Sequence, residues 1–139
     1  GISTCIDTSG MFPLTDKIKK VIDVTDIFLL DIKCINDDIC TWLTGSSNKL
    51  ELEFAKYVSN CGKRLWIRQV LVPGITDKES DLVSLRDFLK TINVEKFEFL
   101  GYHDLGKYKW EKLGFKYELE NTPVATKADL DRAYSIINS

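Results

Sequence analysis

Ile27-Phe28-Leu29-Leu30 is a run of four apolar residues, and Leu65-Trp66-Ile67-Arg68-Gln69-Val70-Leu71-Val72 is a second run in which only two residues are polar. Both runs are rich in the aromatic and β-branched residues that favour strands. Near-continuous apolar strands are typical of parallel sheets that are covered on both faces. The two runs therefore predict parallel strands in an α/β fold, with cover on both faces.

Strand and helix patterns alternate along the rest of the chain. Four segments are predicted as strands: Ile2–Asp7, Ile27–Lys33, Arg64–Val72 and Val94–Leu100. Helical spacing or a helix-start signal predicts helices at Thr15–Asp23, Asn36–Leu43, Asn48–Asn60, after a capping box of Thr76 and Glu79, at Lys107–Leu113, and after a similar box of Thr126 and Asp129. This alternation predicts four parallel βα units joined by right-handed crossovers.

In the third predicted helix, Leu50, Phe54, Tyr57 and Val58 have the spacing of one helix face. We therefore expect these four side chains to form the buried stripe of that helix. In the helix that follows Thr76, the corresponding stripe is Leu82, Leu85, Phe88, Leu89 and Ile92.

The composition restricts the classes of function. The 139 residues, 44% of them hydrophobic, suffice for a single domain with one core. The net charge is −2 and the signs are intermingled, so no basic face is available for nucleic acid or an anionic membrane. No apolar stretch approaches the roughly 20 residues that cross a bilayer, and Gly1–Gly10 lacks the pattern of a signal peptide. We expect a soluble, cytoplasmic chain.

The four cysteines, Cys5, Cys34, Cys40 and Cys61, are widely separated. Their spacing matches neither the short pairs of zinc sites nor a compact iron–sulfur motif, so we expect free thiols in a reducing compartment. The sequence also lacks the glycine-rich phosphate loops, the G-x-S-x-G elbow and the H-E-x-x-H zinc motif. Several common enzyme classes are therefore without their signatures.

Charged or titratable residues interrupt or follow all four predicted strands. The carboxyl ends of parallel strands share one edge of the sheet, where α/β proteins bind ligands. Carboxylates together with lysine, arginine and histidine suit a ligand with both anionic and cationic groups, such as an amino acid-like moiety, or a ligand held with a cation. The residues concerned are Asp7, Asp31, Lys33, Arg68 and His103.

Each of these residues also has an ordinary structural interpretation. Asp7 is suited to a turn with Thr8 and Ser9. Asp31 and Lys33 are suited to a surface ion pair, and Arg68 to a structural one. His103 is equally an ordinary loop residue. The argument for a site is that all of them lie at the same end of the predicted sheet.

Six runs of residues, in their order and spacing, resemble pyruvate formate-lyase activating enzymes across nearly the whole chain. The runs are Cys5-Ile6-Asp7-Thr8-Ser9-Gly10, Leu29-Leu30-Asp31-Ile32-Lys33, Leu52-Glu53-Phe54-Ala55-Lys56-Tyr57, Trp66-Ile67-Arg68, Val72-Pro73-Gly74 and Tyr102-His103-Asp104-Leu105-Gly106-Lys107-Tyr108-Lys109-Trp110. The resemblance implies a radical S-adenosylmethionine enzyme of anaerobic metabolism on a partial (β/α)6 TIM-like barrel, of which residues 1–139 form the C-terminal portion.

In this family a [4Fe–4S] cluster held by three cysteines reductively cleaves S-adenosylmethionine, and the resulting radical abstracts hydrogen from a glycine of the partner. The resemblance implies a glycyl-radical enzyme of the pyruvate formate-lyase type as partner and an electron donor such as flavodoxin or ferredoxin. It implies a cofactor-binding set of Asp31, Lys33, Arg68, Val70 and His103. It implies a monovalent-cation site made of Asp7, Asp31 and the carbonyls of Thr8 and Leu29. It also implies that Arg68, Lys107 and Trp110 contact the partner.

The sequence departs from the family pattern in three places. The C-x3-C-x2-C motif and the Gly-Gly-Glu motif do not occur, and Gly101 stands where the family usually has proline. We expect both missing motifs upstream of Gly1, and we expect the chain alone to be inactive. An unpaired edge at Ile2–Asp7 would then favour self-association.

Two other functions are compatible with the residues. Lys33, at a strand end beside Arg68, could form a Schiff base in an aldolase-type enzyme. Alternatively, Gly106–Trp110 could dock a large partner in a protein without catalytic activity.

Overall fold

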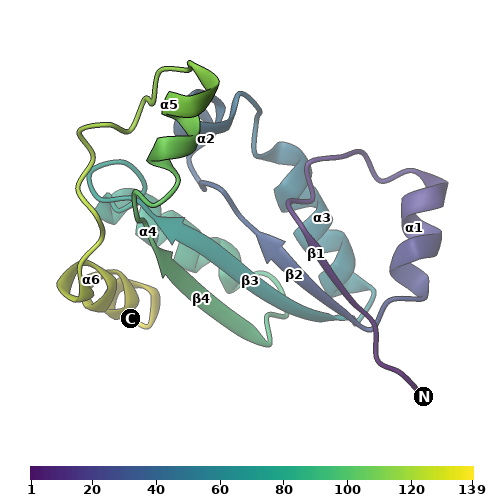
Figure 1. Cartoon of the computed structure of the whole chain (residues 1–139). Helices are drawn as coiled ribbons and strands as arrows, with labels where there is room; N and C mark the ends of the chain where they lie inside the picture. Colours follow the sequence, from purple (N-terminus) through teal and green to yellow (C-terminus); the bar gives the residue numbers. More distant parts are fainter.

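The computed structural model describes residues 1–139 and contains one parallel sheet (Figure 1). Its strands lie in the order β1-β2-β3-β4, and each pairs in parallel with its neighbours in the sequence. This sequential order is that of a (β/α) barrel segment, whereas a doubly wound sheet reverses its order. The predicted α/β class is confirmed. The strands are β1 (Cys5–Thr8), β2 (Ile27–Asp31), β3 (Arg64–Leu71) and β4 (Lys96–Gly101).

Six helices accompany the strands. None of them has the length and apolar character that crossing a membrane requires. The helix starts expected at Thr15, Asn36 and Thr126 are confirmed, because each of these side chains accepts a backbone N–H of its helix. The helices are α1 (Asp16–Asp23), α2 (Asp37–Thr44), α3 (Lys49–Asn60), α4 (Glu79–Leu89), α5 (Lys107–Leu113) and α6 (Lys127–Ile137).

The capping box predicted at Thr76 and Glu79 is wrong. Helix α4 begins at Glu79 with Lys78 as its N-cap and has no side-chain cap. The buried Thr76 hydroxyl instead donates to the Val70 carbonyl (3.0 Å) and accepts the Val72 N–H (2.8 Å). Thr76 therefore closes the turn after β3, because unpaired backbone groups at a buried strand end need partners.

Strand boundaries also differ from the prediction. β1 begins at Cys5 rather than Ile2, and β4 begins at Lys96 rather than Val94. β2 ends at Asp31, so that Lys33 lies in the turn beyond the sheet.

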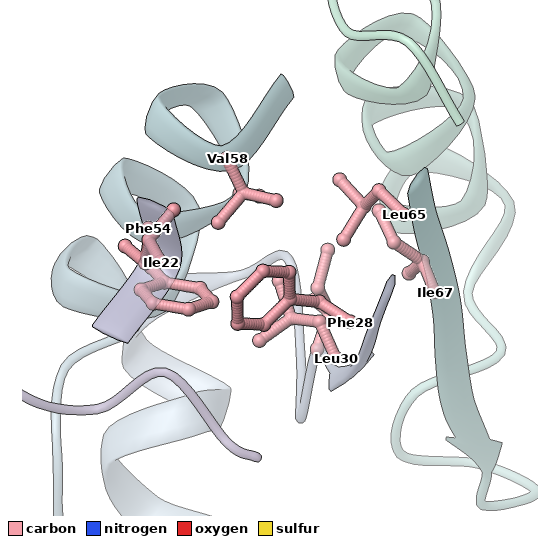
Figure 2. Packing of buried hydrophobic residues seen from close by; sticks show 9 residues of the cluster. Ile22, Phe28, Leu30, Phe54, Val58, Leu65 and Ile67 are labelled. Carbon is pink, nitrogen blue, oxygen red and sulfur yellow. The ribbon is translucent and has the colours of Figure 1, made fainter. Parts of the chain in front are cut away.

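Helices α1, α3, α4 and α6 pack against one face of the sheet, and the core lies there. Figure 1 shows α3 and α4 behind the strands. Figure 2 shows Phe28 and Leu30 of β2 packed among side chains of α1, α3 and β3, namely Ile22, Phe54, Val58, Leu65 and Ile67. A second cluster joins β3 and β4 to α4 and α6 through Leu71, Leu82, Leu85, Phe99 and Ala133.

The opposite face, which we call the open face, has no helix over it. Its residues alternate with those of the core and are partly or largely exposed: Asp7, Leu29, Asp31, Trp66, Arg68, Val70, Glu98 and Leu100. The expectation that both faces are covered is therefore wrong. In a closed barrel this face lines the interior and the remaining strands cover it. Four strands leave it open, which explains why apolar and charged residues are mixed there.

Gly10→Ala should destabilise the fold more than Gly45→Ala. Both glycines have positive φ angles, +64° and +77°, which cost a residue with a Cβ about 1–2 kcal/mol. At Gly10 the new Cβ would also meet Leu30 Cδ1 at 2.9 Å and Phe54 Cβ at 3.2 Å, whereas at Gly45 it meets nothing within 4 Å. The crowding should add about 1–3 kcal/mol. Urea denaturation of both variants measures the difference, and equal losses would contradict the close contact.

Candidate functional site

Four charged side chains form a chain of ion pairs on the open face, which we call the strand-end network: Asp7, Asp31, Lys33 and Arg68. Asp31 and Arg68 are partners in the register of β2 and β3, so their side chains project from the same face. Arg68 Nε donates to Asp31 Oδ1 (2.9 Å), and its Nη2 donates to both carboxylate oxygens of Asp7 (2.7 and 2.9 Å). Lys33 Nζ donates to the other oxygen of Asp31 (3.0 Å).

The network is half-buried and its charges alternate. The side chains of Arg68, Asp31 and Lys33 are 23%, 28% and 35% exposed, and that of Asp7 is 59% exposed. Burial disfavours the charge of Arg68, yet the hydrogen bonds that Arg68 donates to Asp7 and Asp31 outweigh this effect, and the pKa of Arg68 is raised. The guanidinium therefore stays charged, and two cations face two anions with no net charge.

The structure brings together four of the predicted site residues and places three more beside them. Thr8 accepts the Gly10 N–H through its hydroxyl (3.0 Å), which closes the turn after β1. Leu29 is in register with Asp7 on the neighbouring strand. Val70 lies two residues beyond Arg68 on the same face, and with its register partner Leu100 it forms an exposed apolar patch. Charged groups and an apolar surface thus adjoin at the C-terminal edge of the sheet.

His103 is not joined to the strand-end network by any hydrogen bond or ion pair, and its side chain is exposed. Its neighbour Tyr102 is buried and structural: the Tyr102 N–H donates to the Leu71 carbonyl (3.0 Å), and its hydroxyl pairs with that of Tyr117 (2.7 Å). Burial and the Tyr117 hydroxyl raise the pKa of Tyr102 to about 12. A role for His103 in binding stays a prediction.

Lys107 and Trp110 lie on α5, outside the network. Lys107 pairs with Glu120 (3.1 Å), and this hydrogen bond raises its pKa. Trp110 is 44% exposed, and its ring packs against Phe115 and Tyr117. In Figure 1 the strands run toward the end of the molecule where α2 and α5 lie, so these residues are on the same side of the fold as the network.

Sequence reasoning missed Glu51, a carboxyl that lies beneath the network. Glu51 of α3 is fully buried; its Oε1 accepts the Lys33 backbone N–H (3.2 Å) and its Oε2 has no partner. Burial raises the pKa of Glu51 to about 8, although the backbone N–H groups of Lys33 and Cys34 and the positive charge of Lys33 oppose the rise.

A signal for Glu51 was present in the spacing of α3. Glu51 precedes Phe54, Ala55 and Val58 by three, four and seven residues, and these are the buried residues of the helix. The stripe predicted from Leu50 is therefore wrong in its first member, since Leu50 is exposed.

The four cysteines are free thiols; Cys34 and Cys40 are buried, and Cys5 and Cys61 are exposed. Burial raises the pKa of Cys34 to about 11 and also raises that of Cys40. No group of three or more His, Cys, Asp or Glu side chains is arranged to hold a metal ion. We therefore assign no step of iron–sulfur cluster chemistry to the residues of this chain.

Curated relatives align with this chain from end to end. The chain is 43% identical to the pyruvate formate-lyase-activating enzyme of Streptococcus mutans over its whole length, and 42% identical to the pyruvate formate-lyase 1-activating enzyme of Escherichia coli K12 over 99% of it. These alignments cover 55% and 56% of the relatives. The chain thus spans about half the length of the curated relatives it matches. No family model matches the chain.

Solved structures share the fold. A domain of pyruvate-formate lyase-activating enzyme from Bacteroides vulgatus superposes with a TM-score of 0.79 and 16% identity, covering 99% of this chain and 76% of that one. Streptococcus suis SuiB bound to S-adenosylmethionine superposes with a TM-score of 0.71 and 20% identity, covering 99% and 29%. At these identities the superpositions show the fold alone. The family resemblance noted in the sequence is confirmed by the curated relatives.

Glu51→Gln should change how stability depends on pH. The pKa of Glu51 rises from 4.5 in the unfolded chain to about 8 in the fold. The stability that the protonated carboxyl allows is therefore fully present below pH 4.5 and is lost as the pH rises through 8. Glutamine does not ionise, so the Glu51→Gln variant lacks this loss. At pH 9 its free energy of unfolding should exceed that of the parent chain by about a few kcal/mol.

Urea denaturation between pH 5 and 9 measures this difference. Glu53→Gln is the matched control, because Glu53 lies on the same helix with an exposed side chain. Its curve should run parallel to that of the parent chain. A Glu51→Gln curve that also runs parallel would contradict the raised pKa.

Proposed function

We propose that this chain, a homologue of pyruvate formate-lyase-activating enzymes along its whole length, is the C-terminal portion of such an enzyme and supplies part of its S-adenosylmethionine site. The strand-end network carries the proposal, because it gathers paired anions and cations at the edge of a parallel sheet where α/β folds bind ligands. The chain spans about half of its relatives, so the activity, substrate and partner of the whole protein belong to the proposal.

The exposed groups of the site are suited to S-adenosylmethionine. In the proposal, the Lys33 ammonium binds the cofactor's carboxylate by a charge-assisted hydrogen bond, and Asp31 accepts from its hydroxyl or ammonium groups; both side chains are partly exposed. Val70 and Leu100 offer an apolar surface for the adenine. Arg68 and His103 complete the proposed set. When bound, the cofactor supplies the radical chemistry, and the residues of this chain bind and orient it.

A monovalent cation beside the cofactor is part of the proposal. Asp7, Asp31 and the carbonyls of Thr8 and Leu29 are its proposed ligands. In the structure the Arg68 guanidinium bridges the two carboxylates, so the cation would share their oxygens with Arg68. Each carboxylate oxygen has lone pairs for more than one donor, and the sharing therefore requires no ion pair to break.

The proposed partners follow from the family. A glycyl-radical enzyme of the pyruvate formate-lyase type would contact Arg68, Lys107 and Trp110, and a flavodoxin or ferredoxin would supply the electron for a [4Fe–4S] cluster held elsewhere in the protein. The cytoplasmic location expected from the sequence stays a prediction.

The two alternatives differ in their support. Lys33 is ion-paired with Asp31, whereas a Schiff-base lysine must react as a neutral amine, so the pairing weighs against the aldolase-type enzyme. Docking through α5 is favoured by its exposed apolar residues, Trp110 and Leu113, and is compatible with a role in activation.

In the complete enzyme, Lys33→Met should raise the KM for S-adenosylmethionine about 10- to 100-fold, the loss expected for one charge-assisted hydrogen bond. The measurement is 5′-deoxyadenosine formation after anaerobic reconstitution with iron and sulfide. Arg64→Met is the matched control: Arg64 is on β3 and on the open face, but it pairs with Glu95 at the opposite end of the strand (2.8 Å). An unchanged KM in Lys33→Met would remove Lys33 from the site.

For the 139-residue chain on its own, we expect no [4Fe–4S] absorption and no cofactor cleavage after the same reconstitution, since its cysteines do not converge. We also expect self-association, because β1 is an edge strand with no partner on its outer side. Absorption spectra and sedimentation velocity measure the two properties. Robust cleavage would refute the inactivity, and a clean monomer at high concentration would refute the self-association.

A further inference from the structure

The turn that carries Lys33 is the first stretch of backbone beyond the sheet. The Ile32 N–H still donates to the Arg68 carbonyl (2.9 Å), which is the last bond between β2 and β3. The next N–H, that of Lys33, has no strand opposite it and donates instead to Glu51 Oε1 (3.2 Å). The Glu51 carboxyl therefore supplies the hydrogen-bond acceptor that a neighbouring strand would otherwise provide.

A second side chain of α3 holds the same turn by its carbonyl groups. Asn48 Nδ2 donates to the carbonyls of Cys34 (3.0 Å) and Ile35 (2.7 Å). Asn48 is the N-cap of α3, yet its side chain caps no N–H of its own helix. An N-cap asparagine that caps its helix typically contributes about 1 kcal/mol. Here the buried amide is used for the turn instead.

Both residues thus act from the face of α3 that packs under the turn. They are three residues apart, which places them on one side of a helix. Glu51 accepts the Lys33 N–H, and Asn48 donates to the carbonyls of Cys34 and Ile35. The Lys33 side chain leaves this turn toward the open face, where its ammonium lies on Asp31.

We propose that Glu51 is a positioning residue, with Asn48 as its counterpart, and that it fixes the Lys33 backbone so that the ammonium is held at the ligand-binding edge of the sheet. The inference rests on the proposed function only for the identity of the ligand. A purely structural carboxyl would be difficult to explain at this position, because it is fully buried and one of its oxygens has no partner. Burying such an oxygen without a partner costs free energy, and an apolar residue would avoid that cost. A carboxyl at this position is therefore explained by something that an apolar residue cannot do.

Amide hydrogen exchange of the 139-residue chain tests the proposal without any cofactor. Glu51→Leu removes the acceptor and fills the space, whereas Glu51→Gln keeps an acceptor oxygen. We expect the Lys33 amide to exchange about tenfold faster in the leucine variant, as for the loss of one hydrogen bond, and to keep its protection in the glutamine variant. The Ile67 amide, in the middle of β3, reports global unfolding. Its exchange rate should change only as far as the global stability of each variant changes, which separates local opening of the turn from unfolding.

In the complete enzyme, the same two variants separate positioning from folding. Glu51→Leu should raise the KM for S-adenosylmethionine about tenfold with little change in kcat, and Glu51→Gln should restore most of it. Glu53→Gln, on the exposed side of the same helix, should change neither constant.

Two results would overturn the positioning role: a Lys33 amide that stays protected in Glu51→Leu, or a KM that rises equally in both Glu51 variants. Only the exchange outcome is independent of the proposed function, because it needs no cofactor. If Lys33→Met leaves the KM unchanged, the proposed cofactor contact fails, while the exchange experiment still decides whether Glu51 holds the turn.

Discussion

The bridge from Arg68 to Asp7 and Asp31 joins three strands on the face of the sheet that no helix covers. Elsewhere the strands are held by backbone hydrogen bonds and by the core on the other face. A guanidinium is suited to this position because its planar donors can serve two carboxylates at once, which a lysine cannot do with the same geometry. The charged site and the apolar core are thus two faces of the same strands, and the period of two in each strand separates them.

The other constraint is the point where β2 ends. Beyond Asp31 the backbone loses its strand partners, and a buried turn with unpaired groups would be costly. Asn48, the N-cap of α3, and Glu51 within α3 supply the missing partners after β2. The Thr76 hydroxyl supplies one in the same way after β3, where it accepts the Val72 N–H. The C-terminal edge of the sheet is therefore built from strand residues that face the solvent and from helix or loop residues that fix the backbone beneath them.

These two groups differ in how well the sequence predicts them. Asp31 and Arg68 were predictable, since apolar strands make a charged residue conspicuous and parallel strands gather their ends at one edge. Glu51 and Thr76 are harder to predict: Glu51 has the spacing of the buried stripe of α3, but a carboxylate is expected at the surface, and a threonine before a helix is expected to be its N-cap. Cover on both faces was inferred from the apolar runs Ile27–Leu30 and Leu65–Val72, and it is wrong because Leu29 and Trp66 lie on a face that no helix of this chain covers.

The strand-end network has unused donors, so the proposed ligand would bind without breaking its ion pairs. Lys33 uses one of its three donors on Asp31, and Arg68 uses Nε and Nη2 while Nη1 has no partner in the fold. An incoming carboxylate can therefore add to these cations while the internal pairs remain and hold their side chains in place. Because the side chains are already ordered, binding forfeits little of their conformational freedom, and this preorganisation increases affinity. The alternation of charge that stabilises the edge of the sheet thus also leaves donors available for an anion and acceptors available for a cation, which is the pair of groups that an amino acid-like ligand carries.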